Sequence, residues 1–191
     1  MKTNIKFITL IILLSINISN YAQDKIIQCK DLFTQRNAYN FITTDNAFIL
    51  SNKNNTLYNN NPIPAYMYWE PNKIPNITIS DNYLLILDNL VQKYLKPYFT
   101  NNLSVFYIHL ISDKNTGNLK EVRLKYSKDF NISIEKFEQF EESVLNNNIK
   151  LSFNPYVFSS SNWVGVSIYY EVDNIFNTNP PFNHWITNSF Y

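Results

Sequence analysis

The second half of the chain alternates amphipathic helical segments with short strand-like runs, and this pattern constrains the fold most strongly. After Ser80, residues 83–95 place apolar side chains at three- and four-residue spacing, and Pro97 ends the segment. Residues 134–145 have the same spacing, with Ser133 as the expected N-cap residue. Both segments are therefore predicted to be helices.

Four segments have the character of β-strands. Residues 103–111 are mostly apolar, and residues 119–126 alternate apolar with charged side chains across a polar turn. A shorter alternating run covers 149–153, and the most regular alternation covers 164–172. From residue 80 the order is helix, strand, strand, helix, strand, strand. This order predicts an α+β domain whose antiparallel sheet has two helices packed on one face.

The N-terminus is typical of a secretory signal peptide. Lys2 and Lys6 precede a run of ten mostly apolar residues, 7–16, and a polar stretch leads to Ala22. A run of ten residues is too short for a membrane-spanning helix, which needs about 20. We therefore predict removal of residues 1–22, no transmembrane segment in the mature chain, and a periplasmic or secreted location. Retention of the segment as an anchor is the alternative.

The remaining chain divides into three parts by pattern. Residues 23–77 are expected to form an irregular N-terminal extension with short strands, because Asn-rich gaps separate their apolar pairs. Four prolines between 62 and 75 predict an extended connector at the end of this extension. The α+β domain is expected to span 78–176, and an aromatic tail to follow at 177–191.

Composition argues against several classes of site. The formal charge of +1 gives no electrostatic case for binding nucleic acid. The two glycines, Gly117 and Gly165, cannot build a glycine-rich phosphate loop or a nucleophile elbow. One cysteine and two histidines cannot build a Cys/His zinc site. We therefore assign no catalytic, metal or cofactor residue and expect a protein that is not an enzyme, with a hydrolase that uses paired carboxylates as the remaining alternative.

Cys29 is the single cysteine of the chain. It cannot form an intramolecular disulfide, so in an oxidising compartment its partner would be the Cys29 of a second copy. The alternative is that Cys29 is simply a small residue near a terminus.

The elements between residues 105 and 172 also follow a known arrangement. An apolar strand, the turn 113–118, an amphipathic strand, a helix at 133–146, a strand ending at Pro155 and a closing strand succeed one another. This stretch resembles the C-terminal domain of TonB/TolA-type proteins, in the form found in exported proteins of Bacteroidetes-type bacteria. The resemblance implies a TonB C-terminal-like fold. It does not imply energy transduction, because the long Pro-rich, charged spacer of a TonB transducer is missing.

The closing strand supplies the candidate binding residues. Alternation predicts that Ser167, Tyr169 and Glu171 face away from the helices, and Trp163 precedes them. If this strand is a sheet edge, these four residues would accept an extended strand from another envelope protein or a peptide. Residues 119–126 are the alternative edge.

Aromatic side chains offer a different mode of binding. One group lies in the connector (Tyr66, Tyr68, Trp69), and another lies near the C-terminus (Trp163, Tyr169, Phe182, Trp185, Phe190, Tyr191). Such rings either fill the core or form a platform for sugars. The sequence thus favours a non-enzymatic exported interaction module, with a glycan- or peptidoglycan-binding module as the alternative.

Overall fold

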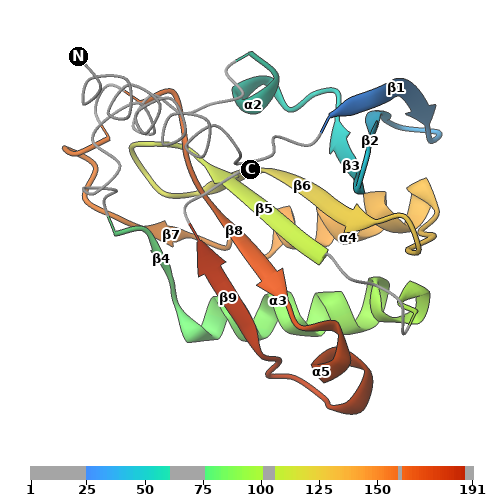
Figure 1. The fold of residues 1–191 in the computed structure, drawn as a ribbon. Helices are drawn as coiled ribbons and strands as arrows, with labels where there is room; N and C mark the ends of the chain where they lie inside the picture. Colours follow the sequence, from blue (N-terminus) through green and yellow to red (C-terminus); the bar gives the residue numbers. More distant parts are fainter. Residues whose placement is uncertain (1–24, 61–75, 101–105, 159–160, 188–191) are drawn as a thin grey trace, which may run out of the picture.

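The computed structural model describes residues 25–60, 76–100, 106–158 and 161–187 (Figure 1). The predicted signal peptide and nearly all of the proline-rich connector lie outside the described residues. The same holds for Tyr66, Tyr68, Trp69, Phe190 and Tyr191 among the candidate aromatic residues.

A seven-stranded antiparallel sheet forms the centre of the molecule. Its strands lie side by side in the order β1-β2-β3-β6-β5-β8-β9. Their bounds are β1 Ile26–Phe33, β2 Ala38–Thr44, β3 Ala47–Asn52, β5 Phe106–Ser112, β6 Leu119–Ser127, β8 Val164–Tyr170 and β9 His184–Thr187. Two short strands, β4 Thr78–Ile79 and β7 Leu151–Ser152, pair separately in a second small sheet. The α+β class with an antiparallel sheet is therefore confirmed.

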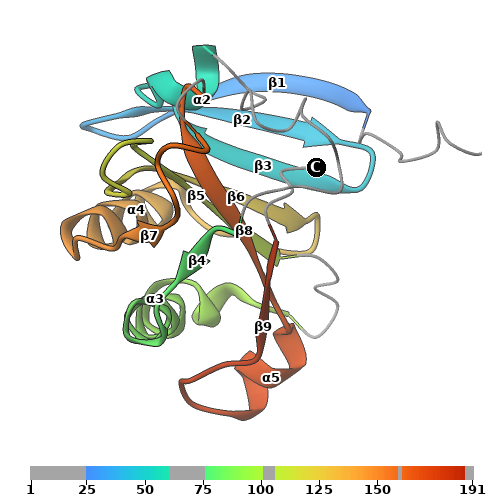
Figure 2. The same cartoon turned by 90° about the vertical axis from the view of Figure 1, so that its left-hand side faces the viewer.

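Two long helices cover one face of the sheet. The helix α3 (Asp81–Tyr94) begins after Ser80, and the helix α4 (Ile134–Asn146) begins after Ser133. The side chain of each serine accepts a hydrogen bond from a backbone N–H group in the first turn of the helix that follows it. Figure 2 shows both helices on the same side of the sheet, where they pack against each other. Three shorter elements are α2 Thr56–Asn60, η3 Lys96–Tyr98 and α5 Val172–Asn177.

The hydrophobic core lies between these helices and the sheet. In β5 and β8, Ile108 and Ile168 are Cα partners and are fully buried, and Leu124 of β6 continues the same layer. Phe137 of α4 and Leu87 of α3 close it from the helix side. We call the opposite side of the sheet, which carries Tyr107 and Tyr169, the second face.

The N-terminal strands β1–β3 belong to the same sheet and core as the rest of the chain. In this respect the structure differs from the irregular extension that was expected for residues 23–77. Strand β3 pairs with β6, with Leu50 opposite Leu124, and Leu50 and Tyr39 are buried in the common core. Residues 26–52 therefore extend the sheet that begins after residue 78, because their apolar side chains face the same helices.

Glutamates of α4 bind this N-terminal part of the sheet. Glu138 accepts hydrogen bonds from the side chains of Thr34, Asn37 and Arg36, which form the β1–β2 turn. The buried Glu141 accepts hydrogen bonds from the Tyr39 hydroxyl at 2.9 Å. It also accepts one from the Asn52 side chain, at 3.1 Å. These contacts join β1–β3 to the helix.

The sheet edges differ from the expected ones. Strand β8 lies between β5 and β9, and β6 lies between β5 and β3, so neither predicted edge is unpaired. The reason is that residues 184–187, expected in the aromatic tail, form β9 and pair with β8, and that β3, from the expected irregular extension, pairs with β6. Within the described residues, β1 and β9 are the edges.

The closing strand is also shorter than its alternation predicts. It ends at Tyr170, because Val172 begins α5. Among the helices that the structure describes, none is both long enough and apolar enough to cross a membrane.

Candidate functional site

Three aromatic rings form a continuous row on the second face of the sheet. Tyr107 of β5 lies opposite Tyr169 of β8, and Tyr169 lies opposite Trp185 of β9. The ring centroids are 5.1 Å and 5.7 Å apart. Residues directly opposite each other in neighbouring strands point to the same face, so the register itself brings the rings together. We call this set of three residues the aromatic row.

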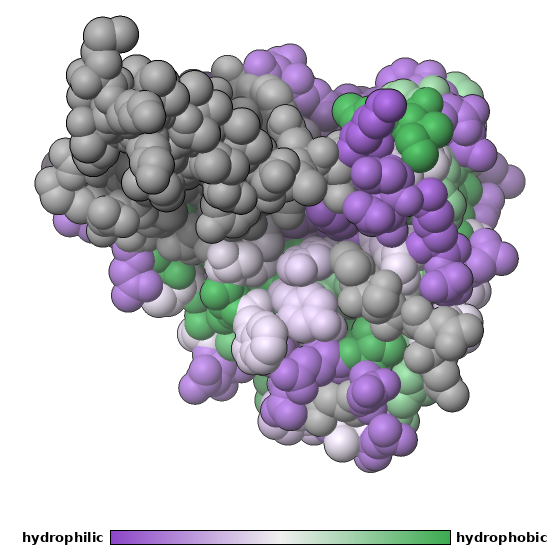
Figure 3. Space-filling view, viewed as in Figure 1, coloured by the Kyte–Doolittle hydropathy of each residue, from purple (hydrophilic) through white to green (hydrophobic). Residues whose placement is uncertain are grey.

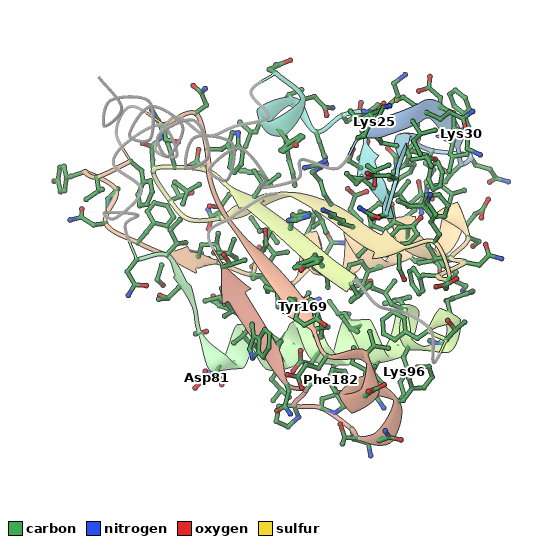
Figure 4. The ribbon with its side chains drawn as sticks, viewed as in Figure 1. Lys25, Lys30, Asp81, Lys96, Tyr169 and Phe182 are labelled. Carbon is green, nitrogen blue, oxygen red and sulfur yellow. The ribbon has the colours of Figure 1, made fainter. Side chains whose placement is uncertain are left out.

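The aromatic row is open to solvent at one end. Trp185, on the edge strand, is 67% exposed, and the two tyrosines are half-buried. Neighbouring rings are tilted by 47° and 37°, which suits a sheet whose strands twist relative to one another. Figure 4 labels Tyr169 on β8, and in the same view Figure 3 shows pale side chains of intermediate hydropathy over β8 and β9. The row is therefore an accessible apolar surface with polar tips.

A second row, of polar residues, lies next to the aromatic row and is buried. Arg123, His109 and Ser167 are neighbours across β6, β5 and β8. His109 Nδ1 lies 2.7 Å from Ser167 Oγ, and the His109 ring is parallel to the Tyr107 ring at 6.3 Å. Burial, with help from Arg123 and Lys125, holds the pKa of His109 well below its usual range. His109 is therefore uncharged at neutral pH and supports the position of Tyr107.

Arg123 is an unusual member of this buried row. It is 4% exposed, and its guanidinium carbon lies 3.5 Å from the centroid of the Tyr58 ring, on α2. Its Nε atom is buried and has no hydrogen-bond partner in the described part of the chain. Such a buried donor is costly unless an acceptor reaches it.

Glu121 lies on the same face of β6 but has other partners. Its two carboxylate oxygens accept the backbone N–H groups of Leu57 and Tyr58, at 2.6 Å and 3.0 Å. Within the described residues, no ion pair joins Glu121 or any other carboxylate to Arg123. Glu121 thus holds α2 in place, and α2 places Tyr58 over Arg123.

The structure brings one of the four predicted site residues into the aromatic row. Tyr169 lies at its centre, whereas Ser167 is buried beside His109. Trp163 is completely buried, with its ring 6.0 Å from that of Tyr58. Glu171 follows the end of β8, and its carbonyl accepts the N–H of Ile175 in α5, so it is not part of the strand.

The sequence contained weaker indications for the other residues of the site, which are Trp185, Tyr107 and Arg123. Trp185 belongs to the predicted aromatic group, but nothing local indicates that its segment pairs with β8. Tyr107 alternates with buried Phe106 and Ile108, a signal that could have placed it on the second face. Arg123 alternates in the same way and looks like a solvated residue until Tyr58 covers it.

Buried carboxylates elsewhere have structural partners. Asp88 of α3 accepts hydrogen bonds from the Tyr170 hydroxyl and the Phe182 N–H, both at 3.0 Å, and so fixes the segment before β9. Among the described residues, no group of three or more His, Cys, Asp or Glu side chains is arranged to hold a metal ion.

Comparison with known proteins gives a likeness in fold. A crystal structure of a DUF5043 family protein from Bacteroides uniformis is similar to this chain. The TM-score is 0.53 at 15% sequence identity, and the match covers 83% of this chain and 93% of the other. At this identity the likeness to the DUF5043 protein concerns the fold alone.

Searches by sequence gave no match. No protein-family profile matches the chain, and no curated protein matches it.

Proposed function

We propose that the protein is an exported, non-enzymatic glycan-binding module whose binding surface is the aromatic row. The observation that carries this proposal is the contact of Tyr107, Tyr169 and Trp185 across three adjacent strands, with Trp185 67% exposed. Aromatic rings with a polar tip offer a large and rigid apolar surface at low entropic cost. The apolar C–H faces of sugar rings stack on such surfaces, while their hydroxyl groups stay hydrated or bind polar neighbours.

Core packing does not account for these rings. The core lies on the helix side of the sheet, where Ile108 and Ile168 are fully buried. The aromatic row lies on the opposite face, and its outermost member is solvent-exposed. An exposed aromatic ring that continues into adjacent, half-buried rings marks an interaction surface more often than a lone exposed ring does.

Binding to a panel of neutral and acidic polysaccharides tests the proposal. We expect Trp185→Ala and Tyr169→Ala to weaken binding at least tenfold, because each removes a stacking ring. Tyr156→Ala is the matched control, since Tyr156 is 87% exposed and lies outside the row. Wild-type binding by the folded Trp185→Ala variant would overturn the proposal.

A second candidate is the acceptance of a partner strand, which is the function expected for an exported module of the TonB/TolA type. The observation in its favour is the edge strand β1, where Ile26, Ile27 and Phe33 are all exposed. An unpaired edge offers backbone donors and acceptors to an envelope protein or a peptide.

Proline substitution tests this second candidate. Adjacent residues of a strand point their N–H groups in opposite directions, so one of Cys29→Pro and Lys30→Pro removes a donor that faces away from β2. We expect that variant to lose capture of the partner from an envelope extract while it stays folded. Equal capture by both variants would exclude strand addition at β1.

Cys29 itself is exposed on β1. A disulfide between two copies is therefore open to test on a non-reducing gel, with Cys29→Ser as the control.

A further inference from the structure

The outer edge of β1 is unpaired in the part of the chain that the structure describes. No described strand lies beyond β1 in the sheet, and Figure 2 shows β1 along the outer margin of the sheet. Every residue of β1 except Leu32 is exposed, and Ile26 and Ile27 are 63% and 61% exposed. An edge of this kind offers its N–H and C=O groups to a strand of another molecule.

Two backbone hydrogen bonds show which residues of β1 offer these groups. The Thr34 N–H donates to the carbonyl of Asn37 in the β1–β2 turn, and the Lys53 N–H donates to the carbonyl of Ala38 on the other side of β2. Along an antiparallel strand, successive residues point their N–H and C=O groups toward one neighbouring strand and then toward the other. The residues of β1 that point these groups outward are therefore Cys29, Asp31 and Phe33.

The β1 strand of a second copy can pair with this edge about a two-fold axis. In such an antiparallel ladder each outward-pointing residue must lie opposite another outward-pointing residue. This condition requires that one residue of β1 lies opposite the same residue of the second copy, at the axis. Within the bounds Ile26–Phe33, the longest ladders that meet it are centred on Cys29 or on Lys30.

Charge decides between these two centres. A ladder centred on Lys30 would place the ammonium groups of the two copies directly opposite each other, which is destabilising. In a ladder centred on Cys29, Lys30 lies opposite Gln28 of the second copy, and Asp31 lies opposite Ile27. The bulge near Ile27 then lies toward each end of the ladder. This second ladder has no directly opposed like charges, and it covers the exposed start of β1 in both copies.

We infer that the protein forms a two-fold dimer in which the β1 strands of two copies pair with Cys29 at the centre. The two seven-stranded sheets then become one continuous sheet. The aromatic row includes the opposite edge strand, β9, so the dimer is independent of the proposed glycan binding. The dimer uses the same edge as acceptance of a partner strand, so these two roles of β1 exclude each other.

Sedimentation equilibrium of the mature protein in a reducing buffer tests the dimer. A single ladder is small compared with the roughly 1,600 Å² that a standard interface buries, so we expect the wild type to pass from monomer to dimer between micromolar and millimolar concentration. Cys29→Pro removes the outward N–H donor at the centre of the ladder and should weaken dimerisation at least tenfold. Cys29→Ser is the matched control, because it keeps that donor, and it should dimerise like the wild type.

Two results of this experiment would overturn the inference. One is a folded wild type that stays monomeric up to millimolar concentration, in which case the edge remains for the partner strand of the second candidate function. The other is equal dimerisation of a folded Cys29→Pro variant. Neither result bears on glycan binding, which Trp185→Ala tests separately.

Cysteine cross-linking tests the register and does not depend on a proline variant. Opposite residues in a hydrogen-bonded antiparallel pair have Cα atoms about 5.5 Å apart, which a disulfide can span. With oxidised glutathione as the oxidant, the two Cys29 thiols lose two protons and two electrons as the S–S bond forms. The glutathione disulfide takes these up and becomes two thiols. We expect the wild type to give a covalent dimer on a non-reducing gel.

Moving the cysteine by one residue provides the control for the register. The double variant Cys29→Ser/Lys30→Cys should cross-link poorly with itself, because residue 30 lies away from the axis. Mixed with the double variant Cys29→Ser/Gln28→Cys, it should form a covalent heterodimer, because residues 28 and 30 lie opposite each other. If Cys29→Ser/Lys30→Cys cross-links with itself more strongly than in the mixture, Lys30 lies at the axis and the inferred ladder is wrong.

Discussion

Ser167 lies directly opposite His109 across the β5–β8 ladder, and its hydroxyl oxygen is 2.7 Å from His109 Nδ1. Ser167 is 1% exposed and His109 is 3% exposed, so this hydrogen bond is shielded from water. A polar pair in such a place stabilises the fold as long as both partners are present.

Ser167→Ala should therefore lower the free energy of unfolding by about 1–3 kcal/mol, because a buried imidazole nitrogen loses this partner. Urea denaturation measures the effect. Ser152→Ala, at an exposed position of β7, is the control and should change stability little. A loss below about 0.5 kcal/mol for Ser167→Ala would mean that the side chain of His109 finds an equivalent partner.

Glu141 should make stability depend on pH near neutrality. Burial raises the pKa of its carboxyl group from 4.5 to about 7, against hydrogen bonds from Asn52 and Tyr39 that lower it. Because the pKa is higher in the folded than in the unfolded chain, protonation of Glu141 stabilises the folded state. This contribution is complete below about pH 4.5 and is lost as the pH rises through about 7, a change on the order of 3 kcal/mol.

Denaturation at a series of pH values tests this prediction. Glu141→Gln is the variant that removes the effect, and Glu135→Gln is an exposed control on the same helix.

Glu138 has the opposite effect on the pH dependence of stability. Burial alone would raise the pKa of Glu138, but hydrogen bonds from Asn37, Thr34 and Arg36 lower it, so its contribution is lost as the pH falls through that lowered pKa. If stability between pH 5 and 7 is flat in the wild type and unchanged in Glu141→Gln, Glu141 is ionised in the folded protein.

Gly117→Ala should destabilise the β5–β6 hairpin. Gly117 has a φ of +70°, where a side chain is strained, and an added Cβ would collide with the carbonyl oxygen of Leu151. The expected loss is about 1–3 kcal/mol or more, since both the strain and the collision act. Thermal melting measures it. Asn148→Gly, at the other residue with positive φ in the described part of the chain, is the control and should be neutral or slightly stabilising.

Ile168→Ala should cost about 2–5 kcal/mol, because Ile168 is fully buried between β5 and β9 under the helices. Ile186→Ala is a useful comparison, since Ile186 lies opposite Ile168 on β9 but is exposed. The same urea titration compares the two variants. Similar losses of unfolding free energy would contradict the difference in burial between Ile168 and Ile186.

Export should produce a mature chain that begins at or near Gln23. The positive start, the mostly apolar run 7–16 and Ala22 have the layout of a secretory signal peptide. Cell fractionation followed by N-terminal sequencing is the measurement. A full-length product in the cytoplasm would contradict both export and the proposed site of action.

Local signals in the sequence were sufficient for the two long helices and for the central hairpin. Ser80 and Ser133 cap α3 and α4 as expected, and the turn that contains Gly117 joins β5 to β6. The partners of β1–β3 were not predictable, because the pairing of Leu50 with Leu124 depends on long-range register rather than on local pattern.

The candidate site was predictable only in part for the same reason. Tyr169 was placed on the correct face by alternation, but the expected edge depended on the absence of a further strand after residue 177. Polar alternation also suggested a solvated face at Ser167 and Arg123. Both are buried, because what covers a sheet is decided by distant segments such as α2.

The strands β1–β3 are synthesised well before the segments to which they attach in the folded molecule. Tyr39 and Glu141, which hydrogen-bond, are 102 positions apart in the chain. The first three strands therefore leave the ribosome long before β6 and α4 exist to receive them. Until then their apolar side chains and free edge are exposed, which is the state most prone to mispairing and aggregation. A chaperone that holds the emerging chain open would thus matter most for residues 26–52.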